Sequence, residues 1–212
     1  MTRRTRIKFC GLTRPMDVTA AVDHGADALG LVFYPPSSRA IDVAIARELI
    51  RLVPPFVTTT GLLVNPSADT VRDLLTAVPL DLLQFHGDED DAFCASFGKP
   101  FIKAVRVKPD ADLESLLGQW PSARGLLLDA WHPEQPGGTG LTFDWQKIPL
   151  RWRDRIILAG GLTSANVADA IRTIRPYGVD VSGGIEARKG EKDSALMAAF
   201  AAAVQHEDSQ HD

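Results

Sequence analysis

Short apolar runs alternate with amphipathic segments along the chain, and the same order repeats eight times. Each apolar run is followed by a loop with Gly or Pro and then by apolar positions at helical spacing. Continuous apolar runs are typical of parallel strands that helices cover. The pattern predicts strands at 6–10, 28–33, 58–64, 80–85, 101–107, 125–128, 155–158 and 178–181. It predicts helices at 15–24, 42–52, 68–77, 88–97, 112–117, 164–174 and 194–204, and a helical piece at 143–147.

Two architectures place helices over parallel strands, and the glycines distinguish them. An open doubly wound sheet favours a Gly-rich turn after its first strand and an acidic residue about 20 residues further on. Here the Gly-rich turns follow the last two predicted strands, where (β/α)₈ barrels hold phosphate groups. The sequence therefore predicts an α/β fold, a (β/α)₈ TIM barrel that forms a single domain over residues 1–212. The polar residues 205–212 are expected to form a frayed tail.

Composition and charge narrow the function classes. The chain has 212 residues, 45% of them hydrophobic, and a net charge of −4, which gives no general attraction to nucleic acid or anionic membranes. The N-terminus lacks the apolar region of a signal peptide, and no apolar run is long enough for a membrane span. Cys10 and Cys94 lie too far apart for a disulfide framework, and Cys94 is interpreted as a packing residue. We expect a cytoplasmic protein.

Cys10 ends the first predicted strand, directly before Gly11. The carboxyl ends of barrel strands carry active sites, so this thiol is a candidate proton acceptor. A buried structural thiol is the alternative, since free cysteine is among the most buried residue types. Lys8 lies two residues earlier and projects from the same face of the strand. If that face is the barrel interior, the Lys8 ammonium is expected to lower the pKa of the Cys10 thiol.

Three more polar residues follow predicted strands. Asp129 ends the sixth strand, and it is either an exposed loop cap or a poorly solvated acid at the barrel mouth. Arg39 follows the second strand and is either a surface residue or a bidentate ligand for a substrate carboxylate. His86 closes the fourth strand and is interpreted as a turn residue. No set of Cys, His and acidic residues has metal-site spacing, so no metal is predicted.

Three glycine clusters are candidate anion sites. The first, at 136–140, lies in a long loop and is either a flexible turn or a segment that closes over substrate. The other two follow the seventh and eighth predicted strands, the former directly before a predicted helix, and each alone fits an ordinary turn. Together, at consecutive late strands, they indicate a phosphate site built from backbone N–H groups. The residues assigned to it are Gly138, Gly160, Gly161, Ser182, Gly183 and Gly184.

In combination these motifs resemble the phosphoribosylanthranilate isomerase family, in order, from residue 7 to about residue 200. The segment 8–13 follows the family pattern K-x-C-G-[LI]-[TR]. The first glycine cluster followed by Phe-Asp-Trp at 143–145 is also specific, whereas the Gly-Gly-Leu at 160–162 recurs in other phosphate-binding barrels. Gly183 departs from the second serine that the family often has, which removes a side-chain contact to phosphate. Other matching segments are 33–40, 63–65, 84–87, 180–186 and 190–193.

The resemblance implies an isomerase of tryptophan biosynthesis. Its reaction is an Amadori rearrangement of N-(5-phosphoribosyl)anthranilate to 1-(2-carboxyphenylamino)-1-deoxyribulose 5-phosphate. It implies Asp129 as the general acid, Cys10 as the general base and Arg39 as the ligand of the anthranilate carboxylate. It also implies a small-molecule phosphoribosyl substrate and no cofactor. The residues expected to support this chemistry are Lys8, Gln84, His86 and Asp180.

Other function classes stay open at the level of sequence. A sister barrel of histidine biosynthesis performs the same rearrangement, but its first strand carries an aspartate where this chain has Cys10. A non-catalytic phosphate-binding barrel would need neither Cys10 nor Asp129. A thiol hydrolase would need a histidine beside Cys10, and no motif fixes one there. A monomer and a homodimer are equally compatible with the sequence.

Overall fold

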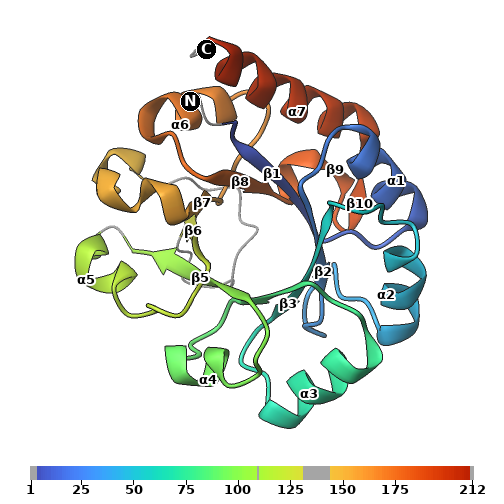
Figure 1. The fold of residues 1–212 in the computed structure, drawn as a ribbon. Helices are drawn as coiled ribbons and strands as arrows, with labels where there is room; N and C mark the ends of the chain where they lie inside the picture. Colours follow the sequence, from blue (N-terminus) through green and yellow to red (C-terminus); the bar gives the residue numbers. More distant parts are fainter. Residues whose placement is uncertain (1–3, 109, 131–143, 211–212) are drawn as a thin grey trace.

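The strands form one closed parallel barrel in the computed structural model, which describes residues 4–108, 110–130 and 144–210 (Figure 1). Strands β1 to β8 follow one another around the barrel, and β1 pairs with both β2 and β8 to close it. The predicted (β/α)₈ barrel is thereby confirmed. The strands are β1 (Arg6–Cys10), β2 (Ala28–Val32), β3 (Thr58–Leu63), β4 (Leu82–Phe85), β5 (Phe101–Val107), β6 (Gly125–Ala130), β7 (Ile156–Leu158) and β8 (Gly178–Val181).

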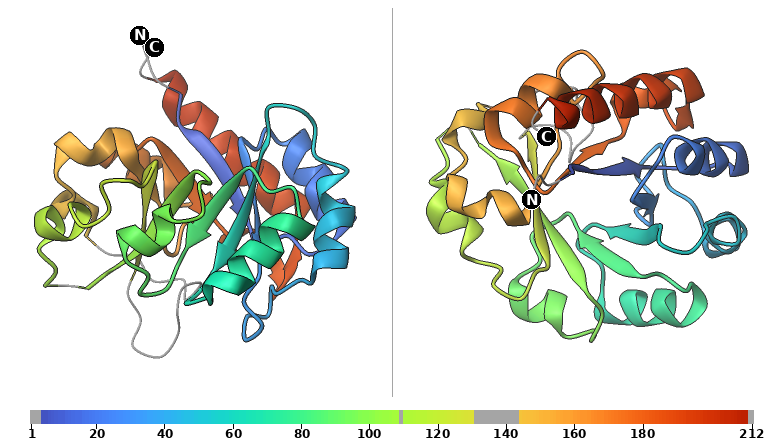
Figure 2. Two further views of the ribbon diagram at one scale, coloured as in Figure 1. Left: turned by 60° about the horizontal axis from the view of Figure 1, so that its bottom comes forward. Right: turned by 45° about the horizontal axis from the view of Figure 1, so that its top comes forward.

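Helices surround the barrel on its outside, as the two further views in Figure 2 show. Most begin at a side chain that caps the first turn, such as Ser67 before α3 and Asp193 before α7. The last helix packs against α1 and α6, and Phe200 of α7 meets Phe9 of β1 edge to face. The helices are α1 (Pro15–Asp23), α2 (Val43–Ile50), α3 (Ala68–Ala77), α4 (Asp91–Ala95), α5 (Leu113–Leu117), α6 (Val167–Ile174) and α7 (Ser194–Ser209), with short 3₁₀ turns η1 (Trp145–Lys147), η2 (Leu150–Arg155) and η3 (Gly183–Ile185).

Alternate residues of each strand face the helices and the barrel interior, because side chains of a strand alternate between its faces. On β1, Ile7 and Phe9 belong to the main core beneath the helices. Cys10 instead packs in a separate apolar cluster with Val32 and Leu62. The first strand therefore places its thiol inside the barrel, at the carboxyl end, as the sequence predicted.

Two predicted helices begin later than expected. The helix predicted over 88–97 spans only Asp91–Ala95, because Glu89 is held in the preceding loop by the backbone N–H groups of Asn65 and Gly87. The helix predicted from 164 begins at Val167. Here the Asn166 side chain accepts from Thr163 N and donates to Gly161 O, which keeps these residues in a turn. The glycine turn after β7 therefore does not open directly onto a helix.

The expected frayed tail is wrong for residues 205–209, since α7 continues to Ser209. Two carboxylates hold its last turns: Asp208 accepts from Thr5 N and Oγ1, both at 2.7 Å, and the buried Glu207 pairs with Arg172 at 2.6 Å. The prediction also missed an antiparallel hairpin after β8, formed by β9 (Glu186–Arg188) and β10 (Glu191–Lys192). Strands this short and this charged carry no periodic apolar signal.

Candidate active site

A cavity of about 760 Å³ lies at the carboxyl ends of the barrel strands. It brings together most residues that the sequence singled out, from strands and loops far apart in the chain. Lys8 lies beneath it rather than on its wall, and Gly138 lies outside the described residues. The predicted residues on its wall are Cys10, Arg39, Gln84, His86, Asp129, Gly160, Gly161, Asp180, Ser182, Gly183 and Gly184.

Cys10 stands above a buried ion pair between Lys8 and Asp180, whose Nζ and Oδ1 atoms lie 2.7 Å apart. Burial raises the pKa of the Cys10 thiol above its ordinary value, and the nearby Lys8 ammonium opposes this only in part. The expected lowering by Lys8 is therefore present, and burial outweighs it. Burial lowers the pKa of Lys8, yet Asp180 and Cys10 outweigh it and leave that pKa raised. Lys8 is thus held as a cation beside the thiol.

Gly30 makes the close approach of this thiol and ammonium possible. It is the partner of Cys10 in the register of β1 and β2. A Cβ at position 30 would lie 2.6 Å from Cys10 Sγ and 3.1 Å from Lys8 Nζ. Real Cβ atoms essentially never come within 3.0 Å of another group, so any side chain at position 30 would displace the sulfur.

Asp129 lies on the opposite part of the wall, in β6, and is 5% exposed. Its Oδ2 lies 3.2 Å from Nε2 of His86, a close contact without good hydrogen-bond alignment. Gln84 Nε2 lies 3.2 Å from His86 Nδ1. As the amide stands, its nitrogen can only donate, so Nδ1 accepts and the ring proton sits on Nε2, facing Asp129. His86 thus lies on the cavity wall as a close neighbour of Asp129.

Arg39 already holds a carboxylate. Its Nε and Nη2 donate to the two carboxylate oxygens of Glu186, at 2.7 and 2.8 Å. Lys192 Nζ donates to the same carboxylate at 2.8 Å. Hydrogen bonding to Glu186 raises the pKa of Arg39. Burial would raise the pKa of Glu186, but Arg39 and Lys192 more than offset this and lower it. The Arg39 guanidinium that the sequence predicted to bind a substrate carboxylate is therefore already held in a bidentate geometry by the carboxylate of Glu186.

The two late glycine turns pack tightly against their neighbours. Gly160 and Gly161 have φ of +79° and +63°, which favours glycine. A Cβ at Gly160 would lie 2.5 Å from Ala130 N, and a Cβ at Gly184 would lie 2.0 Å from Leu162 O. Both turns line the cavity, so their backbone groups can approach a ligand without a side chain between.

Sequence reasoning assigned no role to Glu186 or Lys192. Lys192 is fully buried, and its ammonium also donates to Ser182 O at 3.1 Å and Ser182 Oγ at 3.2 Å. Burial lowers its pKa, and Glu186 opposes that shift. The available signal was the resemblance, since both residues lie in segments that match the family, at 180–186 and 190–193, but it gave neither residue a role.

Within the ranges that the structure describes, no group of three or more His, Cys, Asp or Glu side chains is placed to hold a metal ion. Across the same ranges, none of the helices combines the length and apolar character needed to cross a bilayer. Both cysteines are free and buried, and burial raises the pKa of Cys94 to about 12. Cys94 packs in the core, as predicted.

The closed barrel, with a thiol, a carboxylate and two glycine turns around one cavity, defines the class of the protein: a (β/α)₈-barrel enzyme with an acid–base site. A sequence profile described as N-(5'phosphoribosyl)anthranilate (PRA) isomerase matches residues 7–203. The chain belongs to this family, and it is an isomerase of tryptophan biosynthesis.

Individual proteins similar to this chain agree with the family assignment. An N-(5'-phosphoribosyl)anthranilate isomerase from Dechloromonas aromatica (strain RCB) is 52% identical over 205 residues, 97% of this chain and 98% of the relative. The crystal structure of phosphoribosyl anthranilate isomerase from Thermotoga maritima matches with a TM-score of 0.86 and 38% identity, over 95% of this chain and 99% of that one. A second structure, of phosphoribosyl anthranilate isomerase in complex with reduced 1-(o-carboxyphenylamino)-1-deoxyribulose 5-phosphate, matches with a TM-score of 0.82 and 36% identity over the same shares of the two chains.

Proposed function

We propose that Cys10 is the general base and Asp129 the general acid of the isomerase reaction. The enzyme catalyses the Amadori rearrangement of N-(5-phosphoribosyl)anthranilate to 1-(2-carboxyphenylamino)-1-deoxyribulose 5-phosphate. The observation that carries the assignment is that both side chains line one cavity, together with a guanidinium and two glycine turns. A proton donor and a proton acceptor on one cavity wall suit a reaction in which the ring oxygen gains a proton and C2 loses one.

The two groups act in succession. The carboxylic acid of Asp129 gives its proton to the furanose oxygen, the bond from that oxygen to C1 breaks, and the anilino lone pair forms a C1–N double bond. The thiolate of Cys10 then takes the proton from C2. The electrons of the broken C2–H bond form a C1–C2 double bond, and the nitrogen recovers its lone pair. The resulting enol tautomerises to the ketone. Each positioned proton transfer typically contributes about 10²–10⁴ in rate.

Substrate binding uses the rest of the wall in this proposal. Arg39 meets the anthranilate carboxylate in place of, or beside, Glu186. The phosphate lies against Gly160, Gly161 and the turn 182–184, with Gly138 as a further contact from outside the described residues. The ligand of the similar structure carries both a carboxyl and a phosphate group, which supports two anion subsites. The chain would work as a single barrel domain in the cytoplasm, on a small phosphoribosyl substrate and without a cofactor.

The test is turnover of freshly generated phosphoribosylanthranilate, followed by the loss of its fluorescence. Cys10→Ala and Asp129→Asn should each lower kcat by roughly 10²–10⁴, because each removes one proton transfer. Circular dichroism and binding of the reduced product analogue should stay close to wild type. Near-normal turnover by either variant would overturn the role of that residue. Arg39→Met should raise KM more than it lowers kcat, and an unchanged KM would reject the carboxylate contact.

A further inference from the structure

The β9–β10 hairpin forms a wall of the cavity that no barrel strand provides. It pairs antiparallel, with Lys192 opposite Glu186 and Glu191 opposite Arg188. Its turn contains Gly190 at φ +84°, and a Cβ there would lie 2.8 Å from Ser38 O. The hairpin therefore fits closely against the loop that carries Arg39.

The inner side of the hairpin contacts both anion subsites. Glu186 receives the Arg39 guanidinium through both carboxylate oxygens. The Lys192 ammonium bridges the Glu186 carboxylate and the Ser182 backbone and hydroxyl. A shift of the hairpin would therefore move the carboxylate ligand and the phosphate turn together.

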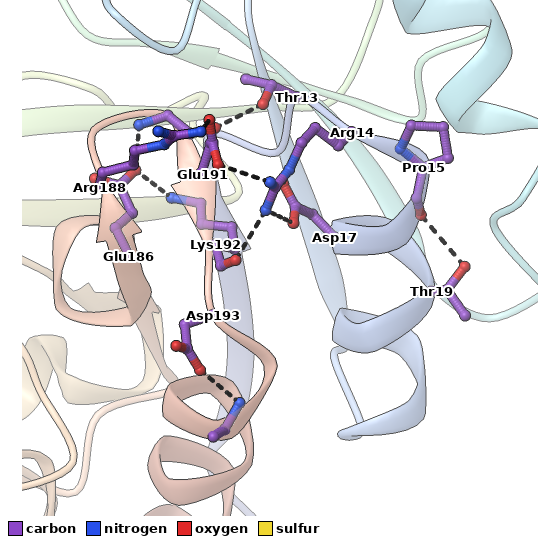
Figure 3. Close-up of polar contacts among 12 residues, drawn as sticks. Thr13, Arg14, Pro15, Asp17, Thr19, Glu186, Arg188, Glu191, Lys192 and Asp193 are labelled. Atoms are coloured by element: carbon purple, nitrogen blue, oxygen red, sulfur yellow. Dashed lines mark hydrogen bonds and ion pairs between the residues drawn. The ribbon is translucent and has the colours of Figure 1, made fainter.

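The outer side of the hairpin is bound to the loop that follows Cys10, as Figure 3 shows. Thr13 Oγ1 donates to Gly190 O at 2.6 Å. Arg14 Nη1 donates to Glu191 Oε2 at 2.9 Å, and Arg14 Nη2 donates to Lys192 O at 2.9 Å. The same guanidinium donates two hydrogen bonds to the carboxylate of Asp17, a residue of α1 that is 3% exposed. The donors are Nε and Nη2, at 3.0 and 2.7 Å.

We propose that Arg14 is a positioning residue for the substrate. It binds the β9–β10 hairpin to the first turn of α1 and thereby holds Arg39 and the Ser182 turn in their binding geometry. This inference rests on the proposed function of the cavity. Arg14 is absent from the cavity wall and touches no reacting atom, so its effect passes through the hairpin. The guanidinium suits this position because its planar fork can bond several acceptors at once.

A purely structural role is the competing explanation, and Arg172 supplies a matched control. Arg172 also joins two elements through a guanidinium, with Asp169 at 2.7 Å and Glu207 at 2.6 Å. Its partners lie on α6 and α7, away from the hairpin. Loss of either arginine should lower thermal stability, but only loss of Arg14 should weaken substrate binding.

The experiment measures the Kd of the reduced product analogue by calorimetry, and KM and kcat by the fluorescence assay. Arg14→Met should raise Kd and KM about tenfold, because long side chains left loose must be ordered on binding. Its kcat should stay within about twofold of wild type, and Arg172→Met should change neither Kd nor KM. In a Glu186→Gln background the Arg14→Met effect on Kd should be much smaller, because the hairpin has then lost its hold on Arg39.

An Arg14→Met protein with wild-type Kd and KM, or with an effect fully additive to Glu186→Gln, would overturn the proposal while leaving the isomerase function intact. Wild-type protein without turnover would instead refute the proposed function. If Arg14→Met does not fold, Glu191→Gln decides, since it weakens the contact of Arg14 with the hairpin and leaves the contact with Asp17 in place. Arg188→Met is its control, because it removes only the other ion pair of Glu191, which lies within the hairpin. Glu191→Gln should raise Kd about twofold to threefold, and an unchanged Kd would reject the positioning role of Arg14.

Discussion

The two sides of the cavity are built on different principles. On the side of Cys10, ion pairs run through the wall: Lys8 pairs with Asp180, and Glu186 pairs with both Arg39 and Lys192. On the side of Asp129, the ion-pair contact of the carboxylate within the described residues is with His86. Two of the buried side-chain atoms that have no hydrogen-bond partner among the described residues, Gln84 Oε1 and His86 Nε2, belong to residues on this part of the cavity wall.

The difference indicates how each side meets the substrate. Buried groups that already have partners are fixed before binding, and this preorganisation lowers the cost of ordering them. Buried polar groups without partners have lost their hydrogen bonds to water without replacing them, and a ligand or a bound water can supply the missing bonds. The side of Cys10, the proposed base, therefore holds its geometry by charge, whereas the side of Asp129, the proposed acid, keeps hydrogen-bonding capacity free for a ligand. We call these the base side and the acid side.

The strongest test of a fixed base side is Gly30→Ala, since the new methyl group would overlap Cys10 Sγ. We expect kcat to fall by about 10² or more, because a displacement of about 1 Å at a reacting group costs that much. Gly118→Ala is the matched control, as its Cβ would meet only backbone oxygens at 3.5 and 3.7 Å. Wild-type kcat in Gly30→Ala would mean that the sulfur position is not critical.

Lys8→Met tests the charge on the base side. Because burial already raises the pKa of Cys10 and Lys8 opposes it, removing the ammonium should raise that pKa further. The pH profile of kcat/KM should move to higher pH, and activity at pH 7 should fall at least about tenfold as less thiolate is present. Adding Asp180→Asn should partly restore the profile, since that carboxylate also raises the thiol pKa. An unchanged pH profile of kcat/KM in Lys8→Met would show that the Lys8–Asp180 ion pair does not affect the pKa of Cys10.

The residues of the two sides also show which parts of the site could be predicted from the sequence. Cys10 and Asp129 could be assigned to one rim because the repeat of strand and helix fixes which residues end each strand. Glu186 and Lys192 could not be given a role, because their positions depend on contacts with Arg39 and Ser182 that only folding creates. In the same way, the late start of α6 depends on two hydrogen bonds of the Asn166 side chain, with Thr163 N and Gly161 O, and not on helix propensity.

On the acid side, His86 offers a test with two closely related variants. In His86→Gln the amide nitrogen reaches about as far as Nε2 and can still donate to Asp129, whereas the shorter His86→Asn cannot. We expect His86→Asn to lower kcat by about twofold to tenfold, the range for losing an ordinary hydrogen bond, because Nε2 lies close to Asp129 but is poorly aligned with it. His86→Gln should keep most of the activity. Equal kcat for the two variants would show that the Nε2 proton does not support the acid.

The smallest effect concerns stability rather than rate, and Glu186→Gln reveals it. Removing this partner from a hydrogen-bonded charge network should cost about 1–3 kcal/mol at pH 7, or roughly 2–10 °C in Tm for a chain of this size. The exposed pair of Asp69 and Arg72 on α3 supplies the control, and Asp69→Asn should leave Tm almost unchanged.

The pH dependence of the Tm difference distinguishes a loss of ion pairing from a loss of packing in Glu186→Gln. The folded pKa of Glu186 is lowered, so its contribution is fully present above the unfolded value of about 4.3 and is lost as pH falls through the lower folded value. The Tm difference between wild type and Glu186→Gln should therefore be largest near neutral pH and shrink on acidification. A difference that stays constant with pH would mean that packing, rather than ion pairing, holds the base side together.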